Sequence, residues 1–176
     1  MTSDDEGFSY VSDEVMRKHE HVSEQWDALD AKIGIVLGFA ILVLFQVVLN
    51  SDLNGFIGLP PASGAHTALN FIAVGLFLLG LFFLVAATVA GLKAIWIRNL
   101  YETTITPWWD KYMAGEMEGG EFHGNVVWHL YSWLPYNERQ VKSKASGLRI
   151  MLSCFLFGVV CYVGRLIVIL ISYRVA

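Results

Sequence analysis

The sequence predicts an all-α integral membrane protein: three transmembrane helices, a long N-terminal helix continuing into span one, and a cytoplasmic helical and aromatic segment between spans two and three. Of the 176 residues, 55% are hydrophobic and only 16% are charged. Soluble domains are about 25% charged. The charges are clustered, and they leave three stretches near the roughly 20 apolar residues that a helix needs to cross a bilayer.

The residues before the first span divide into two parts. Residues 1–11 are predicted to form a disordered acidic N-terminus, and residues 12–32 a cytoplasmic helix whose cap is Ser12. Apolar residues recur in this helix at spacings of seven, four and three and form one stripe: Val15, Val22, Trp26 and Leu29. Neither glycine nor proline interrupts residues 12–33, so we expect the helix to continue into span one.

Three segments are predicted to cross the membrane: residues 33–50, 68–97 and 148–173. They leave a short external loop at 51–67 and a cytoplasmic segment at 98–147. A signal peptide is not expected, because 32 mostly polar residues precede span one and no small-residue cleavage site follows it.

The basic residues predict the orientation. Three of the twelve lysines and arginines precede span one, and seven lie from Lys93, near the end of span two, to Arg149, at the start of span three. None lies in residues 51–67. Loops that keep lysine and arginine stay cytoplasmic. We therefore expect a multi-pass protein of the cell membrane with a cytoplasmic N-terminus and an external C-terminus.

No catalytic, cofactor-binding or metal-binding residue is predicted. Glu121, His123 and His129 are zinc-ligand types, but the histidine spacing does not put both rings on one helix face, and the glycines around Glu121 indicate a loop. Ser132 and Ser153 lack a G-x-S-x-G elbow, and phosphate-binding glycine motifs are absent. The net charge of −4, without a basic patch, argues against nucleic acid as a partner. The sequence therefore does not indicate an enzyme.

Tryptophan and tyrosine are concentrated in the cytoplasmic segment. Their apolar rings and polar tips suit the half-wet layer at a membrane surface. Four tryptophans are therefore predicted to be interface anchors: Trp108, Trp109, Trp128 and Trp133. A ligand-binding aromatic pocket is the other interpretation of the same residues.

Three polar residues within the spans are candidates for a pore or a bundle interior: Arg165, Gln46 and Asn70. An intramembrane arginine is costly unless it faces polar surroundings. Arg165 therefore either snorkels to the outer headgroups or faces a bundle interior or an aqueous path. Small residues, such as Gly34 and Gly38 in span one and Gly75 and Gly80 in span two, predict packing seams within or between chains.

Charged residues at the inner ends of spans one and three are candidates for cytoplasmic coupling. Lys32 can reach the inner headgroups, whereas Asp30 points to another side of the helix. We expect Asp30 to meet Lys142 or Lys144 and so to link the first and last spans. The pair either fastens a static bundle or acts as a latch.

Three stretches occur together and in order: DAKIGIVLGFAILVL, GLKAIWIRNLYETTITP and LPYNERQVKSKASGLRIMLSCFLFG. With them the chain, from about Trp26 onward, resembles the Pycsar effector and the related SLATT membrane domains, which are small membrane effectors of prokaryotic anti-phage systems. The resemblance implies an oligomer that perturbs the membrane or forms a pore after a nucleotide second messenger is sensed. It places no nucleotide-binding residue on this sequence.

Two classes of function follow from these observations. The first is an antiviral effector whose partners are the lipid bilayer, further copies of the chain, and a nucleotide second messenger or a nucleotide-sensing protein. The alternative is a constitutive membrane scaffold or accessory subunit without transport or effector activity. A transporter is disfavoured because the spans show no inverted repeat and hold a single charge.

Overall fold

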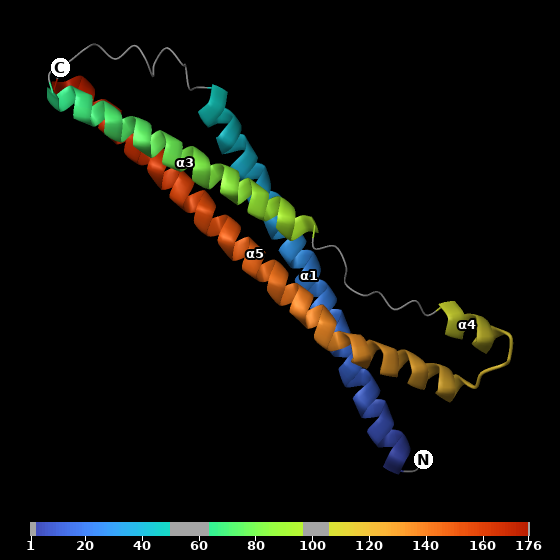
Figure 1. The fold of residues 1–176 in the computed structure, drawn as a ribbon. Helices are drawn as coiled ribbons and strands as arrows, with labels where there is room; N and C mark the ends of the chain where they lie inside the picture. Colours follow the sequence, from blue (N-terminus) through green and yellow to red (C-terminus); the bar gives the residue numbers. More distant parts are fainter. Residues whose placement is uncertain (1–2, 50–63, 97–105, 176) are drawn as a thin grey trace. The chain divides into compact units, whose positions relative to one another are not determined.

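The computed structural model describes residues 3–49, 64–96 and 106–175, which are helical apart from short turns (Figure 1). They form four helices in the described ranges: α1 (Ser3–Leu49), α3 (Gly64–Trp96), α4 (Thr106–Met113) and α5 (Gly119–Val175). These ranges contain no β-strand, so the predicted all-α class is confirmed.

Three of these helices contain stretches long and apolar enough to cross a membrane: Tyr10–Leu49, Ala68–Trp96 and Gly119–Ser172. Few of their apolar side chains are buried by the chain itself. In the most apolar window of α5, only 11% of the residues are buried. Such a surface is unfavourable in water and favourable in lipid. The chain therefore has the helices of a multi-pass membrane protein, as the sequence predicts.

The chain divides into two compact units, which we call the polar unit and the membrane unit. The polar unit consists of Met1–Asp30 and Ile97–Ala145, and the membrane unit of Ala31–Trp96 and Ser146–Ala176. Helices α1 and α5 each belong to both units and continue from one to the other without a break. Each division falls one or two residues before a boundary expected from the sequence.

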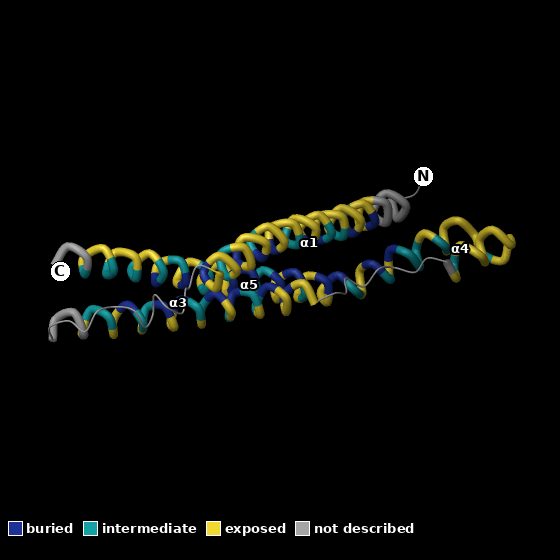
Figure 2. The backbone as a smooth tube through the Cα atoms, turned by 90° about the horizontal axis from the view of Figure 1, so that it is seen from above, coloured by how far each residue is buried: buried dark blue, intermediate teal, exposed yellow. Residues whose placement is uncertain are grey.

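A seven-residue repeat runs along the buried sides of the long helices, which Figure 2 shows in dark blue. In α1 the repeat places four buried residues in one row: Trp26, Ile33, Ala40 and Val47. In α5 it gives two adjacent rows: Leu134, Val141 and Leu148, and Asn137, Lys144 and Met151. An average spacing of 3.5 residues keeps one seam of a helix against its partner, as in a coiled coil.

The N-terminal segment differs from the prediction. Residues 3–11 belong to α1 and are not disordered, and Ser12 lies within the helix instead of capping it. Starting a helix costs far more than extending one. A helix held by the packing of Val15 and Val22 can therefore propagate towards the N-terminus through a segment that contains no proline.

The segment before span three also differs from the prediction. Helix α5 starts at Gly119, so Glu121 lies in a first helical turn and not in a loop. Pro135 lies within this helix. Its lost hydrogen bond is tolerated because its neighbours Leu134 and Asn137 are buried.

Other boundaries can be compared only in part. Pro107 is the second residue of α4, and its fixed φ and missing N–H suit this place in the first helical turn. Residues 50–63 and 97–105 lie outside the described residues. The expected external loop and the inner end of the second span therefore fall mostly or partly outside them.

Candidate functional site

An ion pair occupies the end of the polar unit that adjoins the spans in the sequence. Lys144 Nζ lies 2.6 Å from Asp30 Oδ1. The side chain of Lys144 is only 1% exposed, whereas that of Asp30 is 43% exposed. Of the two bases expected to meet Asp30, Lys144 therefore makes the contact, and Lys142 lies on the exposed side of α5.

The indole ring of Trp26 completes this charged layer. Lys144 Nζ lies 3.6 Å from the centroid of the Trp26 ring, and Trp26 is itself buried. Trp26 and Asp30 are four residues apart in α1, so they lie on the same side of that helix. The ammonium group is thus held between a carboxylate and an aromatic face, which favours a desolvated cation.

The repeat in α5 explains why a lysine is buried here. Lys144 lies seven residues after Asn137 and seven before Met151, in a row that packs inward. A buried charge without a partner is very unfavourable, and its ion pair stabilises the fold only when the geometry is good. The Asp30 carboxylate is therefore required at this position of α1.

A second polar contact lies further towards the N-terminus of both helices. Ser12 Oγ and His123 Nε2 are 2.6 Å apart in a hydrogen bond, and Ser12 is 2% exposed. Sequence reasoning missed this pair, because it assigned Ser12 to a cap and weighed His123 as a metal ligand. The signal was the repeat: Ser12 precedes Trp26 by fourteen residues, which is two heptads.

Apolar clusters fill the space between the two polar contacts. One contains Val15 with Val127 and Leu130. The other contains Val22 and Trp26 with Leu134 and Val141. Contacts advance along α1 and α5 together, so the two helices are parallel in the polar unit. The polar pairs fix their register, because a shift would leave Lys144 buried without its carboxylate.

Three of the four predicted anchor tryptophans belong to two aromatic groups of the polar unit. In the first, the centroids of Trp108 and Trp133 lie 5.1 Å and 6.2 Å from that of His129. In the second, the centroid of Trp109 lies 6.0 Å from that of Phe122. Trp128 lies outside both groups and is 70% exposed. Their role as membrane anchors stays a prediction.

The three residues considered as metal ligands lie in different surroundings. His123 meets Ser12, and His129 packs against Trp108. Glu121 is exposed in the first turn of α5. Within the ranges that the structure describes, no three histidine, cysteine, aspartate or glutamate side chains group as metal ligands would.

The polar residues within the spans lie in different surroundings. The Arg165 guanidinium carbon is 4.6 Å from the centroid of Phe77, so Arg165 of α5 meets α3 in the membrane unit and is half-buried. Asn70, seven residues before Phe77, is half-buried as well. Gln46 is on an exposed side of α1. Arg165 thus makes a contact between two spans.

Glycines bring α3 and α5 close together in the membrane unit. A Cβ atom at Gly158 would lie 2.8 Å from Leu84 Cγ, and one at Gly147 would lie 2.9 Å from Ala94 Cβ. These small residues therefore pack within the chain. In contrast, a Cβ atom at Gly34 or Gly38 would have no described atom beyond its own helix within 4 Å.

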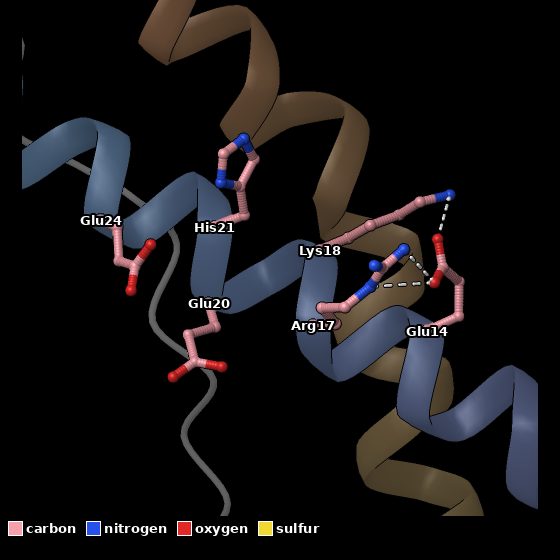
Figure 3. Close-up of a pocket in the computed structure, with 6 residues that line it drawn as sticks. All are labelled: Glu14, Arg17, Lys18, Glu20, His21 and Glu24. Carbon is pink, nitrogen blue, oxygen red and sulfur yellow. Dashed lines mark hydrogen bonds and ion pairs between the residues drawn. The ribbon is translucent and has the colours of Figure 1, made fainter.

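A charged surface lies on the side of α1 away from its buried stripe. Figure 3 shows Glu14, Arg17 and Lys18 around a shallow pocket with Glu20, His21 and Glu24. Arg17 donates to Glu14 Oε2 from Nη2 at 2.7 Å and from Nε at 3.1 Å. These bonds, with the nearby charge of Lys18, hold the pKa of Glu14 below its ordinary value.

No protein-family model, curated protein or solved structure matches this chain.

Proposed function

We propose that the chain is an oligomeric effector of the cell membrane, in which the polar unit receives a signal and the membrane unit responds by opening a leak. The observation that carries the proposal is the continuity of α1 and α5 through both units. A helix that belongs to both units is a route by which a movement in one unit can reach the other. Two such parallel helices, joined by Asp30 and Lys144, form a lever that a binding event can move.

The charged layer supports a switching role more than a purely structural one. A buried ion pair is weak as a source of stability, and well-packed apolar residues often replace it without loss. It is effective at fixing one arrangement of two helices. Loosening of Asp30 from Lys144 would uncover a charge and permit another register of α1 against α5, which is what a latch requires.

The contact of Arg165 with Phe77 supports a response in the membrane unit. A cation on an aromatic ring between two spans is held away from lipid tails. Movement of α5 against α3 would change its surroundings and bring a permanent charge into the path between the spans. The same contact fits the static scaffold that the sequence leaves open, so an experiment must separate the two.

The proposed setting follows the charge distribution and the family resemblance. The N-terminus and the polar unit face the cytoplasm, and the C-terminus is external. The polar unit senses a nucleotide second messenger, directly or through a nucleotide-sensing protein, and the leak stops the growth of a phage-infected prokaryotic cell. The lipid bilayer and further copies of the chain are the remaining partners.

Dye release from liposomes tests the effector role. The full chain is reconstituted in vesicles of phosphatidylethanolamine and phosphatidylglycerol loaded with carboxyfluorescein. We expect release above that of empty vesicles, loss of release with Arg165→Leu, and unchanged release with Arg149→Leu, which removes an exposed arginine from the same helix. Intact vesicles at full protein incorporation, with both the parent chain and the latch variant Asp30→Asn, would contradict the effector role.

Asp30→Asn separates a latch from a static fastening. If the pair restrains the leak, this variant releases dye faster than the parent chain at equal incorporation. Asp13→Asn, at another exposed position of α1, is the matched control and should behave as the parent. Equal rates for Asp30→Asn and the parent would favour a scaffold.

Thiol labelling tests the orientation. In a chain without its native cysteines, Ser63→Cys should react with an impermeant maleimide added to intact cells, and Ser143→Cys should react only after the cells are permeabilised. The reverse pattern would overturn the proposed topology.

A further inference from the structure

An exposed face on α5 of the polar unit combines aromatic and basic side chains. Trp128 is 70% exposed and Tyr131 is 57% exposed, with ring centroids 6.2 Å apart. Arg139 lies eleven residues after Trp128, and Lys142 lies eleven residues after Tyr131; both are exposed. Eleven residues are close to three helical turns. The four side chains therefore lie along one side of α5, rings at one end and cations at the other.

Large exposed rings of this kind are unusual on a surface that meets only water. Trp128 lies twenty residues before Leu148, about 30 Å of rise along the helix at 1.5 Å per residue. Exposed tryptophan and tyrosine beside arginine are the residue types that form the centre of protein interfaces. This face is therefore suited to a protein surface that offers a cation near the rings and acids near the bases.

The outer face of α1 has that distribution. Arg17 and Glu24 are seven residues apart and exposed on the side away from the buried stripe, and Asp27 follows three residues later. Between residues 10 and 30, α1 carries six acidic and two basic side chains. The side chain of Arg17 is 76% exposed even while it binds Glu14.

The register of α1 against α5 places these complementary groups at matching heights. Val15 packs against Val127 and Leu130, so Arg17 is level with the Trp128 and Tyr131 rings. Trp26 packs with Leu134 and Val141, so Glu24 is level with Arg139. Asp30 pairs with Lys144, so Asp27 is level with Lys142.

We infer that the outer face of α1 in one copy packs on the exposed face of α5 in the next copy. Arg17 lies over the Trp128 ring, Glu24 pairs with Arg139, and Asp27 pairs with Lys142. The inference rests on the proposed oligomer and names the surfaces that build it. Two different faces meet, so the contact is heterologous and repeats around a ring.

A second copy is the partner that this matching favours. All copies of one chain enter the membrane in the same direction, and their spans hold them at the same depth. Groups that are level within one copy are therefore level between neighbours. Further along α1, Gly38 lies fourteen residues after Glu24, and no described atom beyond its own helix would approach its Cβ within 4 Å. A neighbouring helix can approach closely at such a residue in lipid.

Cross-linking between two tagged populations tests the contact. Each full chain carries Cys154→Ala and Cys161→Ala; one population adds Glu20→Cys on α1, and the other adds Ser132→Cys on α5. Both positions are exposed beside the inferred contact. With one cysteine per chain, every disulfide joins two copies. We expect oxidation in detergent to give mainly the product that carries both tags.

Lys18→Cys replaces Glu20→Cys in the matched control, because Lys18 is exposed on a different side of α1 and should not cross-link to Ser132→Cys. Glu24→Lys in the α1-tagged chain should reduce the mixed product about fivefold, as expected for an exposed ion pair. Arg139→Glu in the other chain should restore it. A dominant product between two Glu20→Cys chains, or equal cross-linking by the control, would overturn the inference.

Particle mass and dye release distinguish this inference from the proposed function. If the chain forms an oligomer and releases dye while the mixed product is missing, the inferred contact is wrong and the effector role stands. If the chain is monomeric by light scattering and releases no dye, both are wrong.

Discussion

The polar unit and the membrane unit hold the same two helices together by different means. In the polar unit, α1 and α5 form a pair with apolar clusters between two polar contacts, Ser12 with His123 and Asp30 with Lys144. In the membrane unit, α3 joins them, and the closest packing is at glycines such as Gly158 and Gly147. One repeat along α1 and α5 thus serves two kinds of interface.

The surroundings explain the difference. Outside a membrane, burial of Val15, Val22 and their partners drives association, and polar groups are needed to choose one register among several. Between helices in lipid there is little hydrophobic driving force, so close contact of small residues must supply the attraction. The polar unit should therefore be most sensitive to loss of a charge, and the membrane unit to added volume.

The largest effect is expected for Asp30→Asn, which leaves the Lys144 ammonium buried without its carboxylate. Removing one partner of a buried pair costs about 3–5 kcal/mol. Lys144→Met should cost less, because Asp30 is 43% exposed and can be hydrated. Thermal unfolding of the full chain in detergent, followed by circular dichroism, measures both. Equal losses for the two variants would show that burial of Lys144 does not control the energetics.

A smaller loss is expected for Gly158→Leu in the membrane unit. The added side chain would collide with Leu84 and with the backbone of Gly80, which forces α3 and α5 apart. Overpacking of this kind costs about 1–3 kcal/mol. Gly75→Leu is the control, because a Cβ there meets no described atom beyond its own helix within 4 Å. Unfolding in sodium dodecyl sulfate compares them, and equal stability would contradict the glycine seam.

Ser12→Ala should reduce stability by about 1 kcal/mol, the net value of one hydrogen bond. His123 is exposed and can bind water once Ser12 is lost, so the loss should not be larger. Ser143→Ala, at an exposed position of α5, is the control. The rate of amide hydrogen exchange near the N-terminus of α5 should rise in Ser12→Ala but not in the control. An unchanged rate would show that Ser12 does not help to fix the register.

The smallest effect concerns Glu14 at the surface of α1. Arg17 lowers the pKa of Glu14, so their ion pair stabilises the helix above the ordinary pKa of the carboxyl and is lost as the pH falls through the lowered pKa. Glu14→Gln should therefore flatten the dependence of helix content on pH between neutral pH and about pH 3. Glu20→Gln is the exposed control, and an equal flattening there would exclude a specific effect of Arg17.

The sequence predicted more of the fold than of the site. The apolar lengths indicated three spans, and the absence of a breaker after Ser12 indicated one helix from the polar segment into span one. The contact of Asp30 with a base of α5 was expected, but the choice between Lys142 and Lys144 depends on which row of the repeat faces inward. Ser12 and His123 were given other roles, because each looks like a separate local feature until two distant helices meet.

Hydrophobic length and the spacing of apolar residues by themselves determined that this chain is helical and where it can cross a membrane. These are properties of neighbouring residues, and the physics that acts on them is local. Only the tertiary structure decided that Lys144 lies against Trp26 and Asp30, that Arg165 lies on Phe77, and which glycines pack within the chain. Those choices depend on the register between helices that lie far apart in the sequence, which no local pattern fixes.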